Sequence, residues 1–139
     1  MLLDDLPAIK KLLATARTIA VVGLSPKESR PSNMVARYLL AAGYTVIPVN
    51  PGQEEILGLP CYGDLEAVPV PVDIVDIFRR SEDVGSIVDA AIRIKAGAVW
   101  MQEGVINEAA ATKARDAGLS VVMDRCLKTV HHDLGHERG

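Results

Sequence analysis

The chain has 139 residues, which is enough for one hydrophobic core and too few for two domains of ordinary size. Its formal net charge is −3 and no cationic stripe runs along it, which argues against a nucleic-acid partner. No apolar run approaches the length of a membrane span, and the first residues lack the cationic start of a signal peptide. The two cysteines form no metal-ligand spacing, so we expect one reduced, cytoplasmic domain over residues 1–139 with no membrane partner.

Strand and helix patterns alternate along the chain. Apolar runs predict five strands, over residues 18–22, 45–49, 73–78, 98–101 and 119–123. Apolar periodicity and capping residues predict four helices, over residues 6–16, 33–42, 82–96 and 108–117. The side chains expected to cap the first, third and fourth helices are those of Asp4 or Asp5, Ser81 and Asn107.

Two segments lack such a pattern. Residues 50–71 are interrupted by prolines and glycines, and they predict a long loop of the kind that is often functional. Residues 124–139 are charged and are expected to form a C-terminal tail without regular structure. Pro48 lies inside the second predicted strand and argues for a strand end or a bent edge there.

This alternation predicts an α/β fold, a three-layer Rossmann-like arrangement with a doubly wound parallel sheet of five strands. Counting the strands in chain order, we expect the spatial order 3-2-1-4-5. The chain would then reverse its winding direction between the first and fourth strands. Ligands of such sheets bind outside the carboxyl ends of the strands at the reversal point.

The turn after the first strand is the strongest candidate for a binding site, because it contains Gly23, Ser25, Pro26, Lys27 and Arg30. Glycine lets the backbone pass close under a phosphate, and the next helix begins with free N–H groups. The two cations can pair with separate phosphates, although a plain turn with solvated cations is the alternative. The second and third glycines of the dinucleotide fingerprint are missing, which favours a ligand richer in phosphate than NAD.

Further polar residues follow the other strands. Asn50 occupies the place where NAD-binding domains carry an acidic residue for the ribose hydroxyls, and a phosphorylated ribose suits its neutral side chain. The alternative for Asn50 and Pro51 is a simple turn. Phe78 and Arg79 end the third strand, where Phe78 can equally be a core residue. Gln102 and Glu103 follow the fourth strand, and Glu103 can alternatively favour the start of the next helix.

No catalytic residues or metal ligands are predicted. Ser25 lacks the second glycine of a nucleophile elbow, and the lysine-bearing phosphate loop of nucleotide hydrolases is absent. Cations near Cys126 would favour a thiolate there, although an inert buried thiol is the simpler interpretation.

Five segments occur in an order and spacing that together are specific: residues 22–32, 43–51, 73–79, 99–104 and 122–126. They resemble the CoA-binding domain family, small stand-alone proteins similar to the N-terminal domain of the succinyl-CoA synthetase α-subunit. The resemblance runs from about Thr18 to His132 and implies that CoA or an acyl-CoA lies across the carboxyl edge of the sheet.

The resemblance also implies roles for individual residues. It places Gly23, Ser25, Lys27 and Arg30 at the phosphates, Asn50 and Pro51 by the adenosine, Phe78 and Arg79 beside the ligand, and Gln102 and Glu103 near the pantetheine arm. A mixed disulfide between Cys126 and the CoA thiol stays open as an alternative to the inert thiol.

Because the synthetase needs a phosphohistidine domain and a partner subunit that this chain does not supply, we expect non-catalytic binding of CoA or an acyl-CoA. Two alternatives remain: a CoA ligase or transferase subunit that works only with a partner chain, and an NAD(H)-binding redox sensor. A homodimer formed through the first helix is a further expectation.

Overall fold

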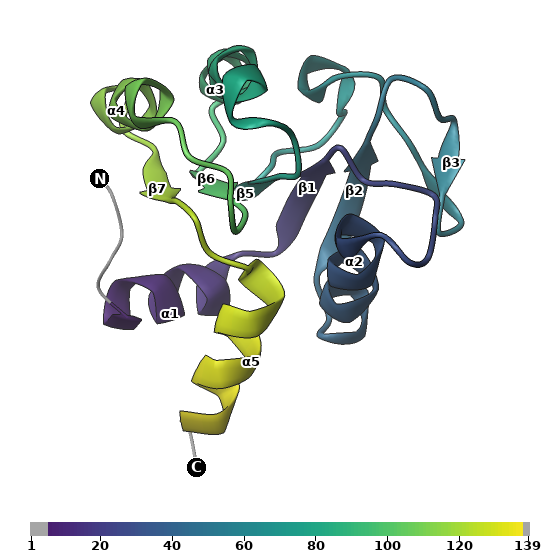
Figure 1. Cartoon of the computed structure of the whole chain (residues 1–139), viewed down its shortest axis with the longest axis horizontal. Coiled ribbons are helices and arrows are strands. Elements are labelled where there is room, and N and C mark those ends of the chain that lie inside the picture. Colours follow the sequence, from purple (N-terminus) through teal and green to yellow (C-terminus); the bar gives the residue numbers. More distant parts are fainter. Residues whose placement is uncertain (1–5, 138–139) are drawn as a thin grey trace.

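The computed structural model describes residues 6–137, and its centre is a five-stranded parallel sheet with helices on both faces (Figure 1). The strands are β1 (Thr18–Val22), β2 (Thr45–Val49), β5 (Ile74–Ile77), β6 (Ala98–Met101) and β7 (Ser120–Val122). The helices are α1 (Leu6–Thr15), α2 (Pro31–Ala41), α3 (Val84–Arg93), α4 (Glu108–Asp116) and α5 (Leu127–Glu137). The predicted α/β class and the three-layer Rossmann-like arrangement are therefore confirmed.

The predicted strand order is wrong in one respect. The spatial order is β2-β1-β5-β6-β7, which is 2-1-3-4-5 when these strands are counted in chain order. The third strand pairs with β1, with Ile19 opposite Ile74, instead of lying beyond β2. Pro48 gives the physical reason, because proline has no N–H for a second neighbouring strand and β2 therefore suits an edge. The winding reversal consequently lies between β1 and β5, not between β1 and β6.

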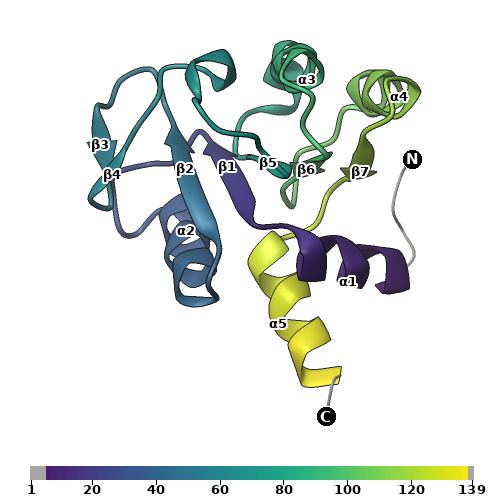
Figure 2. The same ribbon diagram turned by 180° about the vertical axis from the view of Figure 1, so that it is seen from behind.

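Alternating side chains of the strands build two apolar layers. Helices α3 and α4 cover one face of the sheet, and α1, α2 and α5 cover the other (Figure 2). The first layer contains Val75 and Met101, and the second contains Trp100, which is fully buried. Both faces are therefore closed, as expected for a parallel sheet made of continuous apolar strands.

The ends of two helices match the expected signals. Gly43, whose φ is 99°, follows the C-terminus of helix α2, and the N–H groups of Gly43 and Tyr44 donate to the carbonyls of Leu40 and Leu39. This pattern is the glycine-dependent helix termination that satisfies the last carbonyl groups. Asn107 caps α4 as predicted, because its Oδ1 accepts a hydrogen bond from the Ala110 N–H at 2.9 Å. The proposed Asp4 and Asp5 cap of α1 lies outside the described residues.

Three sequence-based expectations need correction. The segment expected to be a C-terminal tail forms α5, with Leu127 and Leu134 buried against the sheet. The predicted loop 50–71 contains a short antiparallel pair, β3 (Glu55–Ile56) and β4 (Leu59–Pro60). Ser81 does not cap α3; a 3-10 turn over Ser81–Asp83 precedes that helix, and the Ser81 hydroxyl bonds elsewhere. None of the helices within residues 6–137 is long and apolar enough to cross a membrane.

Candidate functional site

A cleft of about 800 Å³ opens at the carboxyl edge of the sheet, above the reversal between β1 and β5. The loops that follow β1, β5, β6 and β7 all contribute to its walls. Eight of the residues singled out in the sequence line it: Gly23, Ser25, Lys27, Arg30, Phe78, Arg79, Gln102 and Glu103. Pro26 and Asn50 are not among its lining residues, and Pro51 lines a smaller neighbouring cavity of about 340 Å³.

Gly23 lies in the floor of this cleft, in close contact with the β5 loop. Its φ is 87°, and a Cβ atom placed there would lie 2.4 Å from the Phe78 carbonyl oxygen and 2.9 Å from Arg79 Cδ. Its N–H donates to the Val49 carbonyl at 2.8 Å. Only glycine fits both this conformation and this contact, so the close approach of the first and third strand ends depends on that residue.

Backbone hydrogen bonds shape the turn after Gly23. The Ser32 hydroxyl accepts from the Ser25 N–H at 3.0 Å, and the Ser25 hydroxyl accepts from the Lys27 N–H at 3.1 Å. The Asn33 amide donates to the Ser25 carbonyl at 2.9 Å. Three hydrogen bonds thus hold the turn at Ser25, and the hydroxyl of that residue already has a structural role.

Lys27 and Arg30 are exposed at the rim of the cleft and form no ion pair with any residue in the range 6–137. Helix α2 begins directly after them, with no side-chain cap on its free N-terminus. Two unpaired cations and the positive end of a helix dipole therefore lie together at one side of the cleft. Such a surface favours an anionic ligand.

Asn50 lies outside the cleft and connects the loop after β2 to the loop after β1. Its amide nitrogen donates to the Leu24 carbonyl at 2.9 Å, and its Oδ1 accepts from the Gly52 N–H at 3.0 Å. These bonds match the turn interpretation of Asn50. The smaller cavity beside Pro51 shares Arg79 and Asp83 with the main cleft, so the two hollows adjoin.

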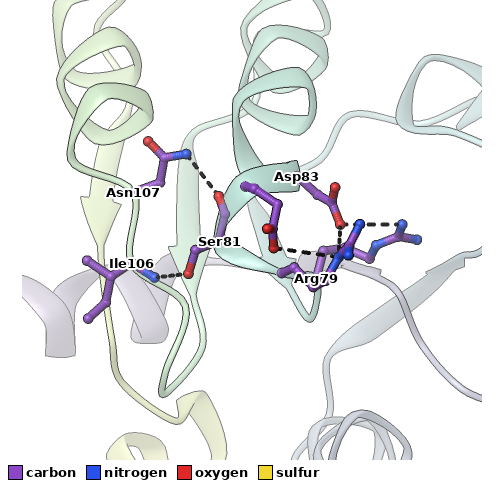
Figure 3. A network of polar contacts seen from close by, with 7 residues as sticks. Arg79, Ser81, Asp83, Ile106 and Asn107 are labelled. Carbon is purple, nitrogen blue, oxygen red and sulfur yellow. Dashed lines mark hydrogen bonds and ion pairs between the residues drawn. The ribbon is translucent and has the colours of Figure 1, made fainter.

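A polar network connects the β5 loop to the β6 loop (Figure 3). Asp83 forms ion pairs with Arg80 at 3.2 Å and with Arg79 at 3.8 Å, which holds the Arg79 side chain beside the cleft. The Ser81 hydroxyl accepts from the Ile106 N–H at 2.9 Å, and the Ser81 carbonyl accepts from the Asn107 amide at 2.9 Å. Figure 3 shows Ser81 as the link between these two loops.

Substituting Ser81→Ala should therefore lower the free energy of unfolding by about 1 kcal/mol, since it leaves the Ile106 N–H without this partner. The matched control is Ser86→Ala, whose hydroxyl only donates to the Asp83 carbonyl at an exposed site. Urea denaturation of both variants checks this prediction. An equal loss in the two would contradict the linking role of Ser81.

The far side of the cleft is formed by the loops after β6 and β7. Gln102 is buried, and its Oε1 accepts from the Leu127 N–H at 3.3 Å. The Trp100 indole donates to the Arg125 carbonyl at 2.8 Å. These two bonds fix the chain on either side of Cys126, which lines the cleft. The Gln102 side chain is therefore engaged with the protein, whereas Glu103 is exposed at the rim.

A sequence model of the CoA-binding domain matches residues 17–132. The chain belongs to the CoA-binding domain family. It is 40% identical over 123 residues to the uncharacterized protein YneT of Bacillus subtilis, a match that covers 88% of this chain and 91% of that protein. A hypothetical protein from Pyrococcus horikoshii OT3 is 39% identical with a TM-score of 0.91, covering 94% of this chain and 92% of that one.

The CoA-binding domain family also connects this chain to larger enzymes. The ADP-forming acetate–CoA ligase I of Archaeoglobus fulgidus is 28% identical over 130 residues, which is 85% of this chain. The match covers only 19% of the ligase, so this chain corresponds to a small part of that enzyme.

The sequence analysis did not single out Asp76, a residue of this CoA-binding domain whose surroundings in the structure are unusual. Asp76 in β5 is completely buried, and neither of its carboxyl oxygens has a hydrogen-bond partner within residues 6–137. Burial raises the pKa of this carboxyl well above its usual range, and negative charge on Cys126 raises the pKa further. An acidic residue inside an otherwise apolar strand was the signal available in the sequence.

Proposed function

We propose that this CoA-binding domain binds CoA or an acyl-CoA non-catalytically in the cleft above β1 and β5, as a single domain. The observation that carries the proposal is the pair of unpaired cations, Lys27 and Arg30, at the rim of a cleft at the winding reversal. CoA has a pyrophosphate and a ribose 3′-phosphate, which match two separated cations. The cleft volume of about 800 Å³ lies within the range of small-molecule sites.

The parts of CoA can be assigned to the walls of the site. The pyrophosphate would lie over Gly23 and the N-terminus of α2, where the backbone approaches closely and the helix dipole is positive. Arg79 and Phe78 would flank the ligand, and the pantetheine arm would run past Glu103 toward Cys126. The adenosine end would extend toward Pro51 and the smaller cavity, because the two hollows adjoin at Arg79.

Replacing Arg30 with alanine should raise the dissociation constant for CoA about 10- to 100-fold, because a charge-assisted phosphate contact contributes about 1.5–3 kcal/mol. If Arg30 binds the 3′-phosphate, dephospho-CoA should lose much less affinity. The matched control is Arg115→Ala, which removes a cation from α4 away from the cleft. Isothermal titration of both ligands checks this, and equal losses for CoA and dephospho-CoA would contradict the assignment.

Thermal shifts with CoA, acetyl-CoA, NAD and NADP test the wider proposal, because a ligand bound only to the native state raises the melting temperature. A rise with NAD alone would favour the redox-sensor alternative. The second candidate function is a CoA ligase or transferase subunit that needs a partner chain. It is favoured by the match to part of the Archaeoglobus fulgidus ligase, and co-purification of a ligase subunit would support it.

A further inference from the structure

Cys126 is held at a defined place in the wall of the cleft. The Trp100 indole binds the carbonyl of the preceding residue, and the Gln102 side chain binds the N–H of the following residue. The Cys126 carbonyl itself accepts from the Val130 N–H at 3.0 Å, as the first turn of α5 requires. The thiol therefore lies at the N-terminus of an eleven-residue helix.

Asp76 lies beneath the same wall. In the sheet it stands between Val21 of β1 and Trp100 of β6. Its side chain faces the layer covered by α1, α2 and α5, because Ile74, two residues earlier, belongs to that layer. Cys126 packs against the same layer, and the charges of the two groups interact.

A buried carboxyl without a hydrogen bond costs stability, and such groups concentrate at functional sites. Besides burial, electrostatic repulsion from Cys126 raises the pKa of the Asp76 carboxyl. Lys27, Arg30, Arg79 and Glu103 line the cleft itself, where the proposed ligand would lie. An isolated buried acid coupled to a thiol in a ligand cleft points to chemistry at that thiol.

We propose that Cys126 is a reactive thiol that exchanges with the disulfide of CoA and retains one CoA as a mixed disulfide, with Asp76 setting the pH at which it reacts. This inference rests on the proposed CoA binding. In the step, the thiol loses its proton to solvent through the open cleft, and the thiolate attacks one sulfur of CoA disulfide. The Sγ–S bond forms as the S–S bond breaks, and the departing CoA thiolate takes up a proton. Cys126 is oxidised and one CoA is reduced, so no further oxidant is needed.

Cys61 provides an internal control. It is also half-buried, but its thiol donates to the Asn50 carbonyl at 3.5 Å and it does not line the main cleft. Burial raises the pKa of the Cys61 thiol, which makes it less reactive. The two cysteines of this chain should therefore behave differently toward the same reagent.

The test incubates the reduced protein with CoA disulfide and follows the adduct by intact-protein and peptide mass spectrometry. We expect one CoA on Cys126, at a rate that saturates with CoA disulfide and exceeds that of hydroxyethyl disulfide by about tenfold or more. Cys61→Ser should react normally, and Cys126→Ser should not react. Cys126→Ala, checked by circular dichroism, guards against loss of reaction through misfolding. Reaction at Cys61 as fast as at Cys126, or equal rates for both disulfides, would overturn the proposal.

The variant Asp76→Asn tests whether Asp76 sets the pH at which Cys126 reacts. Because a carboxylate near Cys126 opposes a second negative charge, the variant should reach half of its maximal exchange rate at a lower pH than the unsubstituted protein. An unchanged pH profile would overturn the role of Asp76. Thermal shift with reduced CoA distinguishes failure of the exchange from failure of CoA binding. A shift without any adduct would overturn the exchange alone, whereas no shift and no saturation would overturn CoA binding as well.

Discussion

Replacing Gly23 with alanine should lower the free energy of unfolding by about 3–5 kcal/mol, among the largest effects of any single substitution outside the core. Two costs add. A non-glycine residue at this positive φ is strained by about 1–2 kcal/mol, and the new Cβ would lie 2.4 Å from the Phe78 carbonyl oxygen. Because that oxygen belongs to the backbone of the β5 loop, relief requires the two loops to separate. CoA binding should weaken in parallel, since these loops form the floor of the cleft.

Gly43→Ala separates the two costs. Gly43 also has a positive φ, of 99°, but nothing lies within 4 Å of a Cβ placed there. This variant should lose about 1–2 kcal/mol from conformational strain alone and keep its affinity for CoA. Chemical denaturation and CoA titration of both variants provide the comparison. Equal losses of stability would show that the contact with Phe78 has no cost.

Asp76 should make the stability of this protein fall as the pH rises above about 4. Its carboxyl is protonated in the native state at pH values where the unfolded chain has already ionised, because burial raises the native pKa. The native state then binds more protons than the unfolded state, so increasing pH favours unfolding. The loss should reach about 1.4 kcal/mol for each unit by which the pKa is raised, and it should level off above the native pKa.

Asp76→Asn should remove this dependence. The amide cannot ionise, so the free energy of unfolding of the variant should vary less with pH than that of the unsubstituted protein from about pH 4, the ordinary pKa of Asp, to about pH 8. The comparison uses the slope of the free energy of unfolding against pH and not its absolute value, because an unpartnered buried amide lowers stability at every pH. Asp116→Asn, at the exposed end of α4, is the control and should leave the slope unchanged. A slope that persists in Asp76→Asn would place the titrating group elsewhere.

This chain is similar both to a small protein of its own length and to one part of a much larger ligase. The chain matches one part of the Archaeoglobus fulgidus ligase and nearly the whole of YneT. If the cleft binds CoA without a partner, the cations and the glycine floor described here are sufficient for recognition. If binding requires a second chain, the exposed rim around Lys27 and Arg30 is where that chain would complete the site.

Local sequence patterns predicted the five strands of the sheet, most of the helices and the loops that line the cleft. Apolar runs marked β1 and β6, glycine marked the end of α2, and Asn107 marked the start of α4. The cations of the first turn were also visible, since polar residues directly after a buried strand lie at its carboxyl edge. Every one of these signals spans a few neighbouring residues.

The choice of neighbours in the sheet depends on tertiary packing, and the sequence did not predict it correctly. Backbone hydrogen bonds between parallel strands are alike for any pair of apolar strands, so periodicity could not distinguish β5 from β6 as the strand that lies beside β1 across the reversal. The same holds for α5, whose apolar positions are few and whose burial depends on the sheet face beneath it. The Ser81 hydroxyl accepts a hydrogen bond from the Ile106 N–H in a distant loop instead of capping the helix that follows it. Cys126 is fifty residues from Asp76 in the sequence, yet it lies close enough to raise the pKa of the Asp76 carboxyl, and no local pattern encodes such a long-range proximity.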